Sequence, residues 1–278
     1  QLLLFLLAVM VGVSLLAGSY PAWILTRFEP VRVLKSSIEI GKNKGFNLRR
    51  GLVVFQFVIA QAFIIGTLVL LSQMRYLQEA DLGFRQEGIV KVKLPGQNRQ
   101  LRKTFKQEVL RLPSVEKATL NFSSPTSGSV SVTSFNIDED ENTYHTQLKF
   151  VDKDYLDVYE IPLLAGRGIG EVDTLSRMVV NEAFLRKVGI ASPEEALGRQ
   201  VEIWGKTLPI VGVVKDFHTL SLSREIEPTA LLDQDEFTKA DILLNRQNMG
   251  ATMKDIEAVW TRLYPEYTFD YDFLDEDI

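Results

Sequence analysis

Two apolar stretches without any charged residue occupy the first quarter of the chain. They run from Leu2 to Ser19 and from Gly51 to Ser72. As a helix, the second stretch of 22 residues would be about 33 Å long, enough to cross a bilayer core of about 30 Å. The first stretch is slightly shorter. The pattern therefore predicts two transmembrane helices, over residues 1–19 and 51–72.

Few polar side chains interrupt these stretches. In the second, the strongly polar ones are Gln56 and Gln61, which either bond neighbouring helices or line a transport path. We favour the first alternative. Ala62 and Gly66 form a pair of small residues at helical spacing, which lets two helix backbones approach closely. The spans are therefore expected to pack against other membrane helices.

After residue 73 the chain becomes polar, and two stretches of it carry the same pattern. In each, an alternating segment is followed by apolar residues at helical spacing, a proline and a second alternating segment. The first unit covers 88–121 with Pro113 as its break, and the second covers 241–273 with Pro265. Two β-α-β units of this kind typically form a split, ferredoxin-like layer of helices on a sheet.

The residues between these units have shorter elements. Alternation predicts strands at 129–137, 144–151, 176–180 and 208–214, a helix follows at 181–188, and Ser192 is placed to cap another helix beginning at Pro193. The predicted fold class is α+β: two transmembrane helices plus a two-lobed domain over 73–278. One lobe is the ferredoxin-like pair, at 82–122 and 240–278, and the other is a mixed α/β lobe inserted at 123–239.

Charge fixes the expected orientation. The segment 20–50 has seven basic and two acidic residues, a net charge of +5, so 73–278 must carry −10 of the chain's total of −5. Basic residues close to membrane helices stay on the cytoplasmic side. We therefore predict that 20–50 is a cytoplasmic linker, with Arg49 and Arg50 as topology anchors, and that the acidic domain lies outside, in the periplasm of a Gram-negative cell. An acidic domain is also a poor binder of nucleic acid.

A search for catalytic or metal-binding patterns finds none that is complete. The chain has no Cys and two His, His145 and His218, which are far apart in sequence. The glycines and lysines of 41–45 lack the order of a phosphate-binding loop. Asp216-Phe217-His218 is interpreted as a turn after a strand, and the acidic runs at 138–141, 233–236 and 275–277 as solvated segments. We expect neither enzyme activity nor a cofactor.

Several segments resemble one family in order along the chain. Three segments are similar to the end of the FtsX-like permease domain: Ser19–Ala22, Glu29–Val31 and Leu34–Lys35. The segment Arg49–Phe57 is similar to the start of the second half in duplicated permeases of this family. Segments similar to the MacB-like periplasmic core domain are Asp154–Leu156, Leu164–Arg167, Val180–Phe184, Ala196–Gly198 and Val211–His218, with Ser221, Leu222 and Pro228 after them.

The resemblance implies a non-catalytic permease subunit of an ABC transporter, of the efflux or lipoprotein-release type. Such a subunit transmits ATP-driven motion from a cytoplasmic ATPase to the periplasmic domain. It would be a multi-pass protein of the inner membrane with further helices before Gln1 and after Ile278. The expected contacts with the ATPase are Pro30, Val31, Leu34 and Lys35. Whether an adaptor or an outer-membrane channel docks on the domain, and what is transported, are left open.

The sequence is also compatible with a second function. A membrane-anchored receptor or signalling module without an ATPase would have the same arrangement of spans, basic linker and outer domain. A periplasmic enzyme is a weaker hypothesis, because no catalytic group of residues was found.

Overall fold

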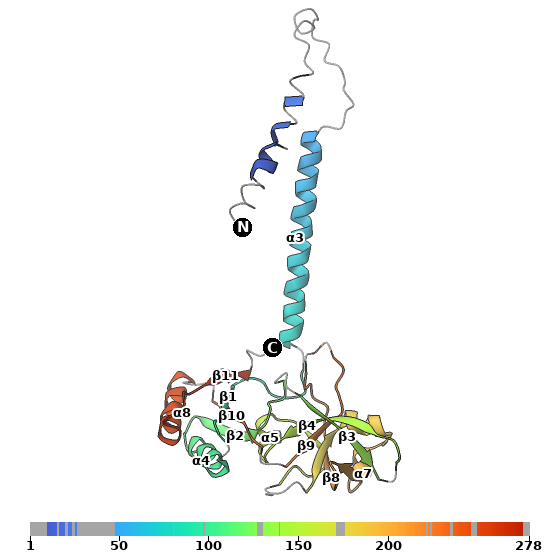
Figure 1. The fold of residues 1–278 in the computed structure, drawn as a ribbon, viewed down its shortest axis with the longest axis vertical. Helices are drawn as coiled ribbons and strands as arrows, with labels where there is room; N and C mark the ends of the chain where they lie inside the picture. The colour runs from blue at the N-terminus through green and yellow to red at the C-terminus, as the bar shows by residue number, and fades with distance from the viewer. Residues whose placement is uncertain are drawn as a thin grey trace, which may run out of the picture. The chain divides into compact units, whose positions relative to one another are not determined.

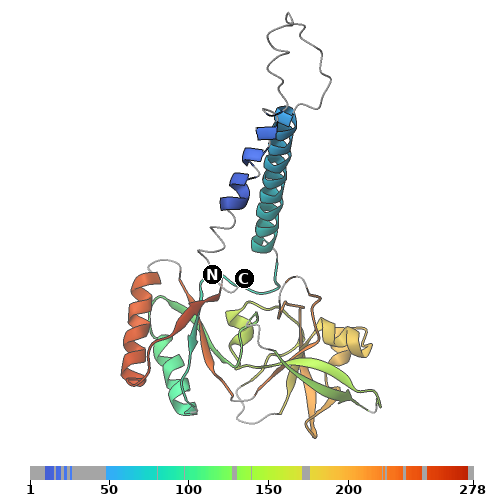
Figure 2. The same ribbon diagram turned by 45° about the horizontal axis from the view of Figure 1, so that its top comes forward.

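The computed structural model describes most of the chain and divides it into two compact units, 1–67 and 68–278 (Figures 1 and 2). The residues that it describes are 10–15, 17–19, 22, 23, 26, 48–79, 81–96, 98–126, 130–138, 140–170, 176–220, 222, 224–233, 236–245 and 249–274.

Helix α3 covers the second apolar stretch and runs from Leu48 to Glu79. Among the described residues, Arg50–Arg75 is the one helical stretch long and apolar enough to cross a membrane, and its side chains are exposed. Phe63, for example, is 73% exposed. A helix with apolar side chains all round needs an apolar environment, which a bilayer supplies.

The first apolar stretch is described only in part. A shorter apolar helix at Met10–Ser19 runs over a residue outside the described set, so the span predicted at 1–19 stays a prediction. Most of the linker at 20–50 also lies outside the described residues. That includes the expected ATPase contacts, Pro30, Val31, Leu34 and Lys35.

Two β-α-β units interleave to form a four-stranded sheet, called the first sheet. Its strand order is β11-β1-β10-β2, and all neighbouring strands are antiparallel. Each unit leaves a gap that a strand of the other fills, which is the split β-α-β arrangement. The elements are β1 (Ile89–Lys93), α4 (Arg99–Val109), β2 (Val115–Asn121), β10 (Lys239–Leu244), α8 (Met249–Leu263) and β11 (Tyr271–Phe273).

Helices α4 and α8 lie side by side and cover the first sheet through an aromatic core (Figures 1 and 2). Phe105 of α4 and Trp260 of α8 meet edge to face, with ring centroids 5.6 Å apart. Both side chains are buried in one apolar cluster with Val90, Val92 and Ile242 of the sheet. Asn98 caps α4 by accepting a hydrogen bond from the backbone N–H of Leu101, so a polar side chain marks where this helix begins.

A second sheet of seven strands is built from the middle of the chain. Its order is β5-β8-β6-β9-β4-β3-β7, and β7 pairs again with β8. Its strands are β3 (Ser131–Ile137), β4 (Tyr144–Phe150), β5 (Leu163–Gly166), β6 (Met178–Asn181), β7 (Gln200–Ile203), β8 (Lys206–Val214) and β9 (Thr229–Leu232). Its helices are α5 (Tyr155–Val158), α6 (Glu182–Val188) and α7 (Pro193–Ala196).

The long strand β8 closes the second sheet into a ring. Its first residues, Lys206–Pro209, pair with β7, and Ile210–Val214 pair with β6 on one side, with β5 joining on the other. A closed sheet has no long free edge and encloses its own apolar interior. The enclosed cluster includes Phe135, Leu148 and Phe184. Ser192 caps α7 by accepting from the backbone N–H of Glu195, as the sequence predicted.

The contact between β5 and β8 depends on a glycine. A Cβ on Gly212 would lie 2.2 Å from the carbonyl oxygen of Arg167, so alanine there must push the two backbones apart. We expect Gly212→Ala to lower the free energy of unfolding by about 1–3 kcal/mol, the usual cost of overpacking. Urea unfolding of the chain in detergent micelles, followed by Trp fluorescence, measures it.

Gly250 of α8 is the matched control. A Cβ on this helical glycine would meet no atom within 4 Å. Gly250→Ala should therefore raise the free energy of unfolding slightly, by up to about 1 kcal/mol. Equal effects of the two substitutions would contradict the close approach at Gly212.

Candidate functional site at the junction of the two sheets

A third apolar cluster, the junction cluster, joins the two sheets. Its members come from both sheets, from α5 and from the segment after α3, and none is more than 8% exposed. They are Leu82, Phe84, Ile89, Val151, Tyr155, Val158, Tyr159, Ile161, Ile169, Val179, Val214, Phe217, Leu231, Leu243 and Leu274.

Strand alternation explains how the same strands serve two cores. In β10, Ile242 belongs to the core of the first sheet, whereas its neighbours Asp241 and Leu243 face the other way. In β9, Leu231 faces the junction and Leu232 the interior of the ring. Each sheet therefore has two buried faces. One packs in the sheet's own core, and the other packs against the other sheet in the junction cluster.

The segment 81–87, called the exit segment, follows α3 and is fastened to this junction. Leu82 and Phe84 are buried in the cluster. The carbonyl oxygen of Leu82 accepts from the backbone N–H of His218 at 2.8 Å, and the backbone N–H of Arg85 donates to the carbonyl oxygen of Tyr159 at 2.7 Å. The backbone of the exit segment is therefore held at two points as well as by its apolar side chains.

Gly83 lets the exit segment approach this closely. Its φ is +79°, and a Cβ there would lie 2.5 Å from the carbonyl oxygen of Asp216. Any other residue would be strained by the backbone angle and would also clash. The Asp81 carboxylate accepts from the N–H of Gly83 at 2.8 Å and stabilises the turn.

The segment Asp216–His218, predicted as a turn, is an irregular segment after β8, and its polar groups complete the attachment. The Asp216 carboxylate accepts from the backbone N–H of Ala183 at 2.8 Å and pairs with Arg186 at 2.5 Å. The backbone N–H of Asp216 donates to Glu182 at 3.0 Å. These bonds fix the segment 216–218 to the start of α6, and His218 in turn donates to Leu82 of the exit segment.

A buried polar group lies within the junction. Asp241 of β10 is fully buried and accepts from the side chains of Asn121 at 2.5 Å and Ser124 at 2.8 Å, and from the hydroxyl of Tyr159. Lys149 of β4 is 1% exposed and donates to the carbonyl oxygen of Ser124 at 2.9 Å. Asp241 of the first sheet and Lys149 of the second therefore both bond Ser124, which lies in the short segment after β2.

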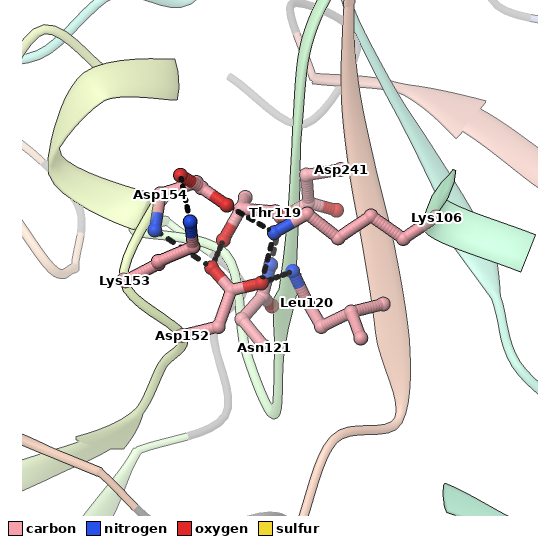
Figure 3. Close-up of polar contacts among 8 residues, drawn as sticks. All are labelled: Lys106, Thr119, Leu120, Asn121, Asp152, Lys153, Asp154 and Asp241. Atoms are coloured by element: carbon pink, nitrogen blue, oxygen red, sulfur yellow. Dashed lines mark hydrogen bonds and ion pairs between the residues drawn. The ribbon is translucent and has the colours of Figure 1, made fainter. Parts of the chain in front are cut away.

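A second polar group links the same elements near the surface (Figure 3). Lys106 of α4 lies between two carboxylates, 2.5 Å from Asp152 and 2.5 Å from Asp154. Asp152, which follows β4, also accepts from the hydroxyl of Thr119 at 2.6 Å and from the N–H of Leu120 at 2.8 Å, both in β2. Asp152 therefore ties the first sheet and its helix to the end of a strand of the second sheet.

Burial sets the ionisation of the groups in the junction. Burial raises the pKa of Asp241, and the hydrogen bonds that this carboxyl receives oppose the rise. Burial lowers the pKa of Lys149 to about 7; Lys239 adds to the effect and Asp241 opposes it. The pKa of the Tyr155 and Tyr159 hydroxyls lies well above its ordinary value, because both are buried close to Asp241.

These residues were not predicted as a site. The structure describes the predicted anchors Arg49 and Arg50 in the first turn of α3. Asp241 and Lys149 stand in predicted strands, at alternate positions that the sequence alone assigns to solvent. Among the described residues, no three His, Asp or Glu side chains converge as metal ligands. The arrangement holds the two sheets together by buried apolar side chains and hydrogen bonds.

The buried Lys149 makes stability depend on pH. Below about pH 7 the Lys149 amine is charged in the folded protein and in the unfolded chain, so folding bears the full cost of burying the charge. Between about pH 7 and pH 10.5 the unfolded chain holds a proton that the folded protein lacks, so stability rises with pH. Lys149→Met removes this rise. We expect the difference in free energy of unfolding between the Lys149→Met variant and the parent to fall, in the variant's disfavour, as the pH rises across that range. The fall should be up to about 1.4 kcal/mol per pH unit.

Urea unfolding of both proteins across this range measures the difference. Lys206→Met is the control, because Lys206 is an exposed residue at the start of β8. Its difference from the parent should stay constant with pH. A constant difference for Lys149→Met as well would show that the amine is not desolvated.

Comparison with known proteins gives this fold a family. A family model described as the MacB-like periplasmic core domain matches residues 52–263. The periplasmic region of MacB from Actinobacillus actinomycetemcomitans has 14% identity and a TM-score of 0.51, with 72% of this chain and 94% of that one covered. No curated protein matches the chain.

Two further solved structures are similar at lower scores. A domain of a putative permease from Porphyromonas gingivalis has 18% identity and a TM-score of 0.48, covering 68% of this chain and 90% of its own. The extracellular domain of the noncanonic ABC-type transporter YknZ from Gram-positive bacteria has 12% identity and a TM-score of 0.46, covering 66% and 97%.

The family match spans most of the chain, from within α3 to the end of α8. It confirms the resemblance found in the sequence and agrees with a mixed α+β domain of the periplasmic type. The chain belongs to the family of the MacB-like periplasmic core domain.

Proposed function

We propose that this chain is part of a non-catalytic ABC-transporter permease that carries motion from a cytoplasmic ATPase to a periplasmic domain. The observation that carries the proposal is the position of the exit segment. It follows α3 directly and is packed into the junction cluster, to which both sheets contribute. A displacement of the end of α3 would therefore act on the contact between the two sheets.

The exit segment is held in the junction as this role would require. Helix α3 continues as one helix to Glu79, and the exit segment that begins at residue 81 is held by Leu82, Phe84 and the bonds to His218 and Tyr159. Backbone hydrogen bonds together with buried apolar side chains resist small displacements, because a packed core has few alternative arrangements. A displacement of the end of α3 would therefore be transmitted to the junction cluster.

The membrane arrangement supports the same function. The basic segment 20–50 would lie in the cytoplasm, anchored by Arg49 and Arg50, and the acidic domain in the periplasm. Spans at 1–19 and 51–72 would pack with other helices of a multi-pass permease in the inner membrane. The domain over 73–278 would act as two lobes, 82–122 with 240–278 and the insert 123–239. A role in efflux or in lipoprotein release fits this arrangement.

The exit segment offers a direct test of coupling. Gly83→Ala should push the segment away from Asp216, because the added Cβ would lie 2.5 Å from that carbonyl oxygen. In the full-length protein purified with its ATPase, we expect the ATPase to be recovered normally but its stimulation by the permease to fall about tenfold or more, as expected when about 1.4 kcal/mol of coupling is lost.

Gly96→Ala is the matched control for that experiment. Gly96 also has a positive φ, +68°, but a Cβ there would meet no atom within 4 Å. It therefore carries the same backbone strain without displacing a neighbour. Normal stimulation in Gly83→Ala, or an equal loss in both variants, would count against coupling through the exit segment.

The contact with the ATPase is tested in the linker. We propose that Pro30, Val31, Leu34 and Lys35 bind the ATPase. A double variant, Leu34→Asp with Lys35→Glu, should abolish co-purification of a P-loop ATPase with the full-length protein, because it introduces charge at an apolar contact and reverses another charge. Lys42→Glu with Lys44→Glu, in the same basic segment, should leave recovery intact. Failure to recover any ATPase with the parent protein would overturn the proposal.

A further inference from the structure

Strand β11 forms one edge of the first sheet, and its outer side is open (Figure 1). It pairs with β1 from Val90 to Val92, and within the described part of the chain no strand pairs with its other side. An unpaired strand edge presents backbone N–H and C=O groups that can bond another extended chain. The outer side of β11 is therefore a candidate binding edge.

The pairing with β1 determines which residues face the open edge. The backbone N–H of Lys93 donates to the carbonyl oxygen of Asp270 at 3.2 Å, so these two residues form a hydrogen-bonded pair of the antiparallel ladder. Such pairs alternate along a ladder. Asp272 therefore directs its backbone groups toward β1, whereas Tyr271 and Phe273 direct theirs away from it. Two residues thus offer N–H and C=O groups with the spacing that an added strand requires.

The side chains give this edge an aromatic face and an acidic face. Phe269, Tyr271 and Phe273 alternate along the strand, and their neighbouring ring centroids are 5.1 Å and 6.0 Å apart. Phe269 and Phe273 pack against the core under the helices, and Tyr271 remains 40% exposed. By strand alternation, Asp270 and Asp272 point to the opposite face. A strand that matches this edge is apolar on one face and cationic on the other.

One carboxylate of the acidic face is left for a partner. Lys93 is paired with Asp270 at 2.7 Å, and this contact, with a smaller effect of the Asp272 charge, raises the pKa of Lys93. The Asp272 carboxylate is exposed and makes no hydrogen bond or ion pair within the described residues. Its cross-strand neighbour Lys91 is buried, so Asp272 is the charge that an incoming strand would meet.

A second copy of this chain does not match the edge. If two β11 strands paired antiparallel through Tyr271 and Phe273, the two Asp272 carboxylates would face each other. A shift of two residues would place Asp272 opposite Asp270 instead. Like charges directly opposite each other destabilise a sheet. The carboxylates that oppose self-pairing are the same ones that would favour a basic strand.

We propose that the open edge of β11 binds an extended polypeptide segment in which apolar and basic residues alternate. The backbone of the segment pairs with Tyr271 and Phe273, its apolar side chains lie on the aromatic face, and a lysine or arginine lies opposite Asp272. That position is a non-hydrogen-bonded pair, in which the opposing Cα atoms are only about 4.5 Å apart. In strand addition the backbone supplies affinity and the alternate side chains supply selectivity. The binding does not depend on the ATPase or on the placement of α3.

Labelled, end-blocked peptides test the edge on the full-length protein in neutral-detergent micelles, with fluorescence anisotropy as the measurement. We expect a peptide of alternating valine and lysine to bind about tenfold or more tightly than one of alternating valine and glutamate. N-methylation of alternate backbone amides of the valine–lysine peptide removes donors and keeps its charge. It should lower the affinity about tenfold, as expected for the loss of two hydrogen bonds.

A charge reversal on the protein locates the binding. Asp272→Lys should weaken binding of the valine–lysine peptide about fivefold and strengthen binding of the valine–glutamate peptide. Glu202→Lys makes the same change of charge at an exposed position of β7 in the second sheet, and should leave both affinities as in the parent. A photoreactive valine–lysine peptide should cross-link to residues 269–273.

Several results would overturn the proposal. Unchanged affinity of the N-methylated peptide would show adsorption by charge alone. Equal effects of Asp272→Lys and Glu202→Lys, or cross-links outside 269–273, would place the binding elsewhere. Absence of binding at about 1 mM peptide would leave the edge without this partner. Ready formation of a disulfide-linked dimer by Tyr271→Cys, in a chain that has no other cysteine, would assign the edge to a second copy.

Discussion

The junction cluster is the contact on which the arrangement of this domain depends. Each sheet already has its own apolar core, one under α4 and α8 and one inside the ring closed by β8. Neither core needs the other sheet. The cluster is made from the opposite faces of the same strands, for example Leu243 of β10 and Leu231 of β9. These faces would be exposed if the sheets separated, so burying them holds the two sheets together.

Polar residues determine how the two sheets meet. Apolar side chains tolerate small shifts, since burial has no preferred direction, but hydrogen bonds do not. Asp241 receives three side-chain donors, one of them from Tyr159 beyond α5, and Lys149 shares Ser124 with it. A shift of one sheet against the other would leave these buried groups without partners, at a cost of about 1–3 kcal/mol for each. The polar groups therefore select one register of the contact.

The local elements were predictable from the sequence, and the junction was not. The β-α-β units follow from alternation, helical spacing and the breaks at Pro113 and Pro265. Strands β5, β7 and β9, of four residues each, were missed; β9 is buried at every position and so shows no alternation. Asp241 and Lys149 were read as ordinary strand residues, since each stands where one face of a strand would meet water. Their burial arises because a distant part of the chain covers that face.

The exit segment is attached to the two sheets by bonds of different strength. It continues covalently into β1 of the first sheet, but it is held to the second sheet's side by two backbone hydrogen bonds, to His218 and Tyr159, and by the packing of Leu82 and Phe84. The covalent path fixes the exit segment to the first sheet, whereas its attachment to the second depends on hydrogen bonds and apolar contacts that are individually weaker. Backbone hydrogen bonds and buried apolar packing acting together therefore hold the exit segment to the second sheet more firmly than any one of these contacts could.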